Sequence, residues 1–206
     1  MFLETLECRV VLSCPSESES LMLTLVNRAR ANPVSELERF NMDLNEGLPP
    51  GTISSFPKYK LIWNSKLNDI ARSHAEYLMH NGLMTHISAN GDGMYERVTK
   101  NGVQAKYVDE NAGVIISSVA YNNLNYGANR LHDAFVTDTS LPGRGHRQQM
   151  LDPKMRQIGI SVINGLWNNV PSVIVVYDMI DTKVYPFNAV FSEKPIETDP
   201  IREEIF

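Results

Sequence analysis

Apolar side chains recur every three or four residues in the first part of the chain, and that spacing predicts helices buried along one face. The first such stretch follows the polar residues 17–20 and ends at Asn32-Pro33. Because Asn is a good N-cap and Pro is tolerated at the first helical position, the same pair can begin a second short helix through Phe40. Residues 45–57 are rich in Gly, Pro and Ser, and we expect them to form a loop.

The clearest helix of the sequence begins at Asn64 or Ser65 and ends at Gly82, a residue suited to the left-handed turn that stops a helix. A Gly-rich loop follows at 89–93. A further short helix is then predicted over 94–100.

Brief β-branched runs mark the later part of the chain. Residues 114–119 form one such run and are predicted to be a strand, and a helix is predicted over 128–137. The runs 158–163 and 172–177 predict two strands, joined at Asn164-Gly165 by a longer hairpin loop. Helices thus come first and antiparallel strands last, which predicts an α+β fold with a sheet between helices.

The composition fits one domain and excludes some partners. With 206 residues, 43% of them apolar, the chain can bury a core, and we assign the domain to 18–181. Residues 1–17 are interpreted as a leader or tail, and 182–206 as a C-terminal extension. A charge of -5 provides no basic face for nucleic acid or an anionic membrane, and no apolar run approaches the roughly 20 residues of a transmembrane segment.

The two cysteines precede the domain core. A bridge between Cys8 and Cys14 would close only a short loop of the tail, so the domain must be held together by packing. Residues 10–13 with Cys14 loosely match a lipoprotein cleavage box. However, Glu4 and Glu7 lie where a positive segment should be, so we expect no lipidation and identify no signal peptide.

Three of the five histidines have simple structural interpretations. His74 falls on the apolar stripe of the long helix and is expected to be a buried, hydrogen-bonded core residue. His80 is off that stripe and is expected to be solvated. His132 follows an amphipathic pattern next to Asp133, and a surface pair between the two is the expected arrangement.

The other two histidines are candidates for chemistry. His86 and His146 both lie just beyond a predicted element, in loops with Gly nearby, where side chains can converge. Glu110 follows a polar turn, and we expect its carboxylate to lie at the end of an element as well. Two imidazoles and a carboxylate in one polar cleft can bind a divalent cation, Zn by default, or exchange a proton.

Several short motifs occur along the chain in a fixed order: Trp63-Asn64-X-X-Leu67, Ala71-X-X-His74-Ala75, Thr85-His86, Glu110-Asn111-Ala112, Gly145-His146-Arg147, Leu151-Asp152-Pro153 and Ile158-Gly159-Ile160. Together they resemble the CAP superfamily, which groups cysteine-rich secretory proteins, venom antigens and pathogenesis-related proteins. The resemblance covers about 21–181. It is nearest to bacterial members, which begin with a segment like 26–33.

The resemblance implies a three-layer α-β-α sandwich with a central, mainly antiparallel sheet. It also implies a cleft with two histidines and two acids that takes up Zn, Mg or Ca in some members. By position these are His86, Glu110, His146 and, as the fourth member, Asp138, which closes the helix nearest His146. The alternatives for the fourth position are Asp133 and Glu96, and no organic cofactor is implied.

Three functions stay open at this point. The first is a module, extracellular or in the cell envelope by resemblance, that binds a divalent metal or a small ligand such as a lipid, sterol or cell-wall fragment. The sequence contains no nucleophile elbow and no HExxH pair. The second is a metal-assisted, peptidase-like hydrolase in which His86 and His146 hold the cation and Glu110 is the general base. The third is a structural or adhesive role, in which the polar groups tie the loops together.

Overall fold

A four-stranded sheet of strand order β1-β3-β4-β2 organises the computed structural model, in which residues 14–181 are described. Strand β1 runs parallel to β3, whereas the β3–β4 and β4–β2 pairs are antiparallel. The elements along the chain are α1 (Glu17–Ala31), α2 (Pro33–Glu38), β1 (Ile62–Trp63), α3 (Ser65–Asn81), α4 (Met94–Lys100), β2 (Val108–Ile116), α5 (Ser118–Asn122), α6 (Leu124–Thr137), α7 (Gly145–Met150), β3 (Gln157–Trp167) and β4 (Val170–Ile180).

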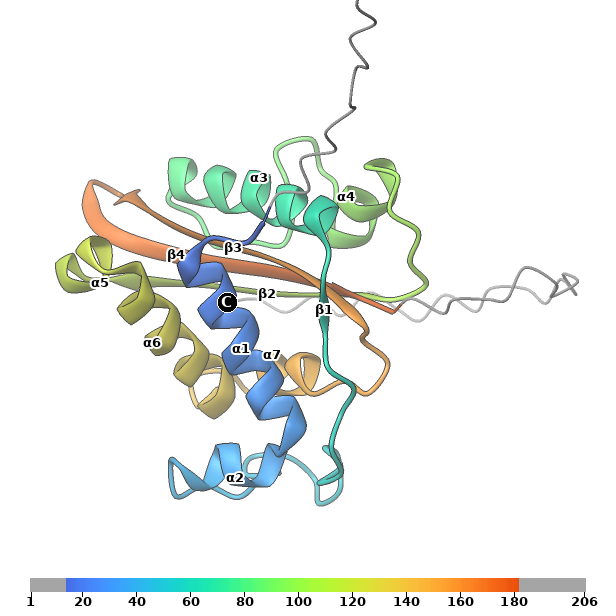
Figure 1. Ribbon diagram of the computed structural model, residues 1–206. Helices are drawn as coiled ribbons and strands as arrows, with labels where there is room; N and C mark the ends of the chain where they lie inside the picture. The colour runs from blue at the N-terminus through green and yellow to red at the C-terminus, as the bar shows by residue number, and fades with distance from the viewer. Residues whose placement is uncertain (1–13, 182–206) are drawn as a thin grey trace, which may run out of the picture.

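Helices cover both faces of this sheet (Figure 1). Helix α3 lies on one face with α4 beside it, and α1, α5, α6 and α7 lie on the other. Alternate residues of β4 point to opposite layers, as the pleat of a strand requires. Ile174 and Val176 pack with the α3 layer, while Val173 and Val175 pack in the larger core beneath α1 and α6. The expected α+β, three-layer α-β-α architecture with a mainly antiparallel sheet is confirmed.

The hairpin between the last two strands is tighter than the sequence predicted. Asn164-Gly165 lies inside β3, and the turn is the two-residue pair Asn168-Asn169. Both asparagines have positive φ, 48° and 66°, as a type I′ turn requires, and asparagine tolerates this backbone region better than most residues. The strands therefore extend to 11 residues each, and the predicted longer loop was wrong.

Strand β2 also differs from the expected strand at 114–119. It starts at Val108 and ends at Ile116, because Ser117 caps the short helix α5 through the backbone N–H of Ala120. Glu110 therefore lies inside a strand, not at the end of an element as predicted. Helix α6 likewise begins earlier than predicted, at Leu124, where Asn123 is its N-cap.

The predictions for the first helices are largely confirmed. Helix α1 starts four residues earlier than the apolar pattern, because Ser16 and Glu19 form a reciprocal capping box. Asn32 caps α2 as predicted, and Gly82 ends α3 with a positive φ. No helix in the described part of the chain is long and apolar enough to span a membrane. Cys14 is a free, exposed thiol, whereas Cys8 lies outside the described residues.

The contact between α3 and the sheet depends on one glycine. A Cβ atom placed on Gly159 of β3 would lie 2.0 Å from the backbone carbon of Leu67 and 2.1 Å from the backbone nitrogen of Asn68. Because these are backbone atoms of α3, no side-chain rotation can relieve the clash. Gly159 therefore allows the start of α3 to lie directly on the sheet.

We predict that Gly159→Ala destabilises the protein by at least about 1–3 kcal/mol, the usual cost of overpacking a core. Denaturant unfolding measures this change. Ser161→Ala on the same strand is the matched control, because Ser161 is fully buried and its hydroxyl has no hydrogen-bond partner within residues 14–181. Equal stability of the Gly159 and Ser161 variants would contradict this account of the packing.

Candidate functional site

The candidate site is built around the carboxylate of Glu110, which is completely buried on the α3 face of β2. Its Oε1 accepts a 2.5 Å hydrogen bond from Nδ1 of His86, in the loop that follows α3. Its Oε2 accepts a hydrogen bond from the guanidinium of Arg97 on α4. Arg97 also donates to the backbone oxygen of His86 at 2.5 Å, so acid, histidine and arginine hold one another in place.

The charge of Glu110 is compensated in this setting. Burial alone would raise the pKa of the carboxyl, but the His86 hydrogen bond and the Arg97 charge more than offset it and lower the pKa to about 2. His74, whose Nε2 lies 3.6 Å from Oε1 of Glu110, has a lowered pKa, chiefly because it is buried. Glu110 is therefore ionised at neutral pH beside a neutral His74.

A second buried acid lies next to Glu110 on the neighbouring strand β4. Asp178 of β4 is the cross-strand partner of Glu110 and also of Gly159, so all three occupy one row under the start of α3. Neither of its side-chain oxygens has a hydrogen-bond partner within the described residues. Burial, and then the negative charge of Glu110, raises the pKa of Asp178 well above its ordinary range. Asp178 is consequently held protonated.

A second acid–histidine pair lies in the layer of α6 and α7. Asp138 ends α6 in a left-handed conformation and is buried. Its Oδ1 accepts a 2.9 Å hydrogen bond from Nδ1 of His146, in the first turn of α7, and its Oδ2 accepts from the backbone N–H of Arg147 at 3.3 Å. The Phe135 ring packs against the His146 ring in a tilted arrangement, with 4.8 Å between the ring centroids.

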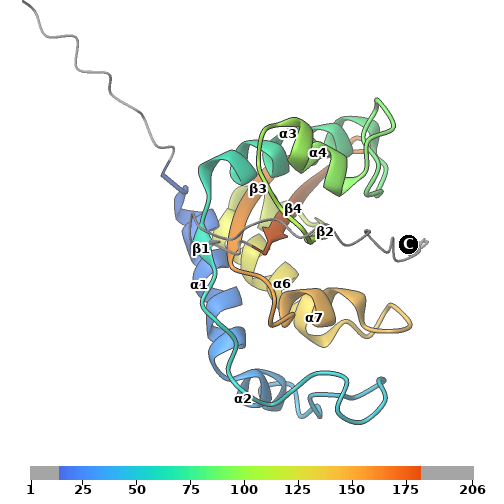
Figure 2. The ribbon, with the colours of Figure 1, turned by 90° about the vertical axis from the view of Figure 1, so that its right-hand side faces the viewer.

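Strand β2 connects the two pairs. Glu110 and its neighbour Asn111 point to opposite faces of the sheet, as successive strand residues do. Asn111 donates 3.0 Å and 2.6 Å hydrogen bonds to the backbone oxygen of His146 and to the hydroxyl of Tyr177. Because β2 is an edge strand, the loop after α3 and helix α7 reach its two faces from either side of that edge (Figure 2).

The structure thus pairs the four predicted site residues as His86–Glu110 and Asp138–His146. Asp138 is the acid in contact with His146, whereas Asp133 is 3.5 Å from Arg39 and Glu96 is exposed on α4. Within residues 14–181, no group of three or more His, Cys, Asp or Glu side chains is arranged to hold a metal ion. The metal site itself therefore stays a prediction.

The three remaining histidines give a mixed outcome. His74 is buried and its Nε2 lies 2.8 Å from the backbone oxygen of Thr85, while His80 is exposed, both as predicted. The prediction of a surface pair between His132 and Asp133 was wrong. His132 is fully buried and its Nε2 lies 3.1 Å from Glu36 of α2, because α6 turns this side chain toward the first two helices.

Sequence reasoning missed two members of the site. Arg97 falls within a correctly predicted short helix, but nothing in that heptapeptide marks it as buried. Asp178 had a usable signal, because it is an acid with apolar residues on both sides in the run Ser172–Ile180, where a strand buried on both faces excludes exposed charge.

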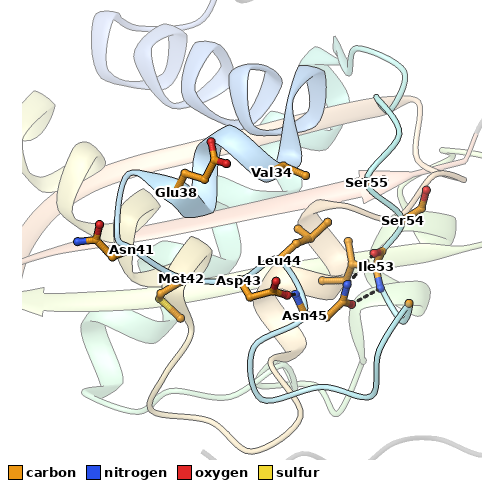
Figure 3. Close-up of a pocket in the computed structure, with 11 residues that line it drawn as sticks. Val34, Glu38, Asn41, Met42, Asp43, Leu44, Asn45, Ile53, Ser54 and Ser55 are labelled. Carbon is orange, nitrogen blue, oxygen red and sulfur yellow. Dashed lines mark hydrogen bonds between the residues drawn. The ribbon is translucent and has the colours of Figure 1, made fainter.

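Two hollows lie close to the helices of the structure, one beside α2 and one beside α3. The larger, about 900 Å³, is formed by α2 and the loop after it, with Leu44 and Ile53 at its base and Glu38 and Asp43 at its rim (Figure 3). The smaller, about 290 Å³, lies between α3, the loop 88–92 and α4, and is lined in part by His74 and Arg97. The smaller hollow therefore shares two side chains with the Glu110 cluster.

Comparisons with known proteins agree with this architecture. The model of the CAP family, described as the cysteine-rich secretory protein family, matches residues 23–177. An extracellular protein of Bacillus anthracis that contains an SCP domain is similar, with 14% identity and a TM-score of 0.53 over 80% of this chain and 40% of that one. An outer surface protein of Borrelia burgdorferi shows 15% identity and a TM-score of 0.53 over 81% of this chain and 95% of that one. At these identities the likeness shows the fold alone, and no curated protein matches the chain.

We predict that Glu110→Gln destabilises the protein by about 3–5 kcal/mol at neutral pH, because it leaves the buried guanidinium of Arg97 without its counter-charge. The pKa of Glu110 is lowered from 4.5 to about 2, so its contribution is present above pH 4.5 and is lost as the pH falls toward 2. Denaturant unfolding across this range should show that pH dependence in the native protein, reduced in the variant. Parallel pH curves would contradict the assigned charge.

Asp178→Asn should have the opposite effect. The raised pKa of Asp178 means that the folded state binds its proton, so the native acid costs stability as the pH rises above the ordinary value of 3.8. We expect the variant to be more stable than the native protein at neutral pH, and we expect this difference to shrink as the pH falls toward 3.8. A loss of stability at neutral pH would contradict the assignment of Asp178 as a protonated acid.

Proposed function

The chain belongs to the CAP family of cysteine-rich secretory proteins, and from this premise we propose that it acts outside the cell as a non-catalytic module that binds a divalent cation through His86 and His146. Zinc is the preferred cation for nitrogen donors of this kind. The extracellular assignment is supported by the Bacillus and Borrelia structures, which are described as extracellular and outer-surface proteins.

The observation that carries this proposal is the shared geometry of the two histidines. In each histidine, Nδ1 is hydrogen-bonded to a buried carboxylate, which is Glu110 for His86 and Asp138 for His146. Histidines that bind metals almost always donate one ring N–H to a carboxylate or carbonyl, which fixes the ring and makes the other nitrogen a better donor. Nε2 is that other nitrogen in both residues; the side chains are 21% and 13% exposed, and the Nε2 atom of His146 itself is buried, so a cation there would be shielded from solvent on that side.

The donor set fits a cation with open coordination positions. Two imidazoles supply two of the four ligands that zinc usually takes, while the carboxylates orient the rings from behind. The remaining positions would be available to water or to a donor atom of a small molecule. Such a site binds more weakly than a closed structural zinc site.

The geometry disfavours hydrolysis. A general base needs a pKa near the working pH and access to the proton that it removes. Glu110 has both carboxylate oxygens engaged, by His86 and Arg97, and its pKa of about 2 makes it a poor proton acceptor at neutral pH. Asp138 is also occupied, by His146 and by the backbone of Arg147.

We predict that the full-length protein binds zinc in isothermal titration and that His86→Ala and His146→Ala each weaken this binding at least about tenfold. His80→Ala is the matched control, because His80 is exposed on α3 and is not one of the proposed ligands, and it should bind zinc as the native protein does. Circular dichroism of each variant confirms that it is folded. Unchanged zinc affinity in both folded site variants, or an equal loss in the His80 variant, would overturn the proposal.

A further inference from the structure

One end of the sheet gathers basic and aromatic side chains that the cation proposal does not use. Strands β1, β3 and β2 all begin at this end, where Ile62, Gln157, Ile180 and Val108 form the last row across the sheet (Figure 2). The segments that lead into these three strands therefore lie at the same end of the molecule. They carry six partly or fully exposed residues that we call the basic end: Tyr59, Lys60, Lys106, Tyr107, Lys154 and Arg156.

Contacts between cations and aromatic rings join these residues into one surface. The guanidinium carbon of Arg156 lies 4.1 Å from the centre of the Tyr59 ring. Two residues earlier in the chain, Nζ of Lys154 lies 4.4 Å from the centre of the Tyr107 ring, and Nζ of Lys106 lies 5.0 Å from the same ring. Three segments that are far apart in the sequence thus form a continuous surface of rings and positive charges.

The positive charge of the basic end is not cancelled by ion pairs. Lys60, Lys154 and Arg156 form no ion pair with another residue of 14–181, where the paired bases are others. Beneath the basic end, the fully buried guanidinium of Arg30 donates to four backbone oxygens, that of Tyr59 among them. Arg30 therefore adds a buried positive charge to the same region.

Acids also border this end, but their charges are engaged or reduced. Oδ1 of Asp181 accepts the backbone N–H groups of Lys106 and Tyr107, at 2.9 and 2.8 Å. Oδ1 of Asp152 accepts the backbone N–H of Lys154 at 2.7 Å. Burial, and then the charge of Asp152, raises the pKa of Asp109 to about 7, so this carboxyl is partly protonated at neutral pH. The exposed charge of the basic end is consequently positive.

We propose that the basic end docks the protein on the surface of a bilayer that contains anionic lipids. Lysine and arginine are attracted to the negative surface potential of such a bilayer, and tyrosine rings are favoured at its interface with water. The net charge of -5, from which we expected no basic face, does not reveal this end, because its bases come from three separate segments.

The exposed rings favour a lipid surface over a soluble polyanion. Tyr59 is 67% exposed, and Ile62, whose backbone N–H donates to the backbone oxygen of Arg156 at 3.0 Å, is 66% exposed. A soluble polyanion would be attracted by the charges and would leave these side chains in water. At a bilayer the same side chains can enter the headgroup region, which adds apolar burial to the electrostatic attraction.

Cosedimentation of the full-length protein with lipid vesicles tests this docking. Vesicles of equal parts phosphatidylcholine and phosphatidylglycerol should sediment the protein, and vesicles of phosphatidylcholine alone should not. High salt should release it, because salt screens the attraction. Lys60→Glu and Lys154→Glu each reverse one exposed charge and should each weaken the binding at least about fivefold. Arg130→Glu, which reverses an exposed charge on α6 outside the basic end, should bind as the native protein does.

Several results would overturn the proposal. They are sedimentation no greater with the anionic vesicles than with phosphatidylcholine alone, unchanged binding in both basic-end variants when circular dichroism shows them folded, and an equal loss in the Arg130 variant. Binding of soluble polyphosphate without binding to either kind of vesicle would also overturn it, because the basic end would then select a soluble polyanion. No residue of the basic end is a proposed zinc ligand, so failure of the vesicle test would leave the cation proposal standing.

Discussion

The buried charge of Glu110 is the constraint on which the site depends. A carboxylate taken completely out of water must be matched by donors and counter-charges, or it would be protonated or would unfold the region. Here the match comes from two segments that follow α3, one carrying His86 and the other carrying Arg97. The hydrogen bonds that Glu110 accepts from His86 and Arg97 therefore help to hold the loop after α3 and helix α4 against β2. The hydrogen bond from Nδ1 also orients the His86 ring.

The charge of Glu110 also explains why Asp178, its neighbour in the row beneath α3, is protonated. Gly159 lets α3 approach the sheet so closely that Asp178, next to it in the row, is sealed from solvent. Two adjacent carboxyls in such a place cannot both be ionised, and the one with the arginine and the histidine keeps its charge. The contacts of Glu110 with Arg97 and His86 thus decide which of the two acids is ionised.

Much of this could be predicted from the sequence, and the exceptions have physical reasons. The periodicity of α3 correctly placed His74 inside and His80 outside, because both positions follow from a single helix face. The pattern around His132 could not show that α6 packs against α2, since that contact joins residues far apart in the chain. Asn164-Gly165 is a good turn pair, but the longer apolar pattern on both strands continued past it to Asn168-Asn169.

The candidate site shows the same limit. Motif order suggested that His86, Glu110, His146 and Asp138 form one group, whereas the structure arranges them as two pairs on opposite faces of β2. An acid can bind a metal directly, or it can hydrogen-bond to a histidine that binds the metal. Which of the two occurs depends on where its side chain points, and the spacing of motifs along the sequence does not determine this. Arg97 could not be predicted for a related reason. It contacts Glu110 only because α4 folds back onto the sheet.

The central claim is that each carboxylate fixes its histidine with Nδ1 protonated, so that a bound cation would be coordinated through Nε2. Side-chain 15N NMR of His86 and His146 in the folded protein, recorded before and after addition of zinc, tests this most directly. The account predicts that Nδ1 of both rings carries a hydrogen and that zinc shifts the Nε2 resonance of each. An Nδ1 atom without a hydrogen, or Nε2 resonances unchanged by zinc, would contradict it.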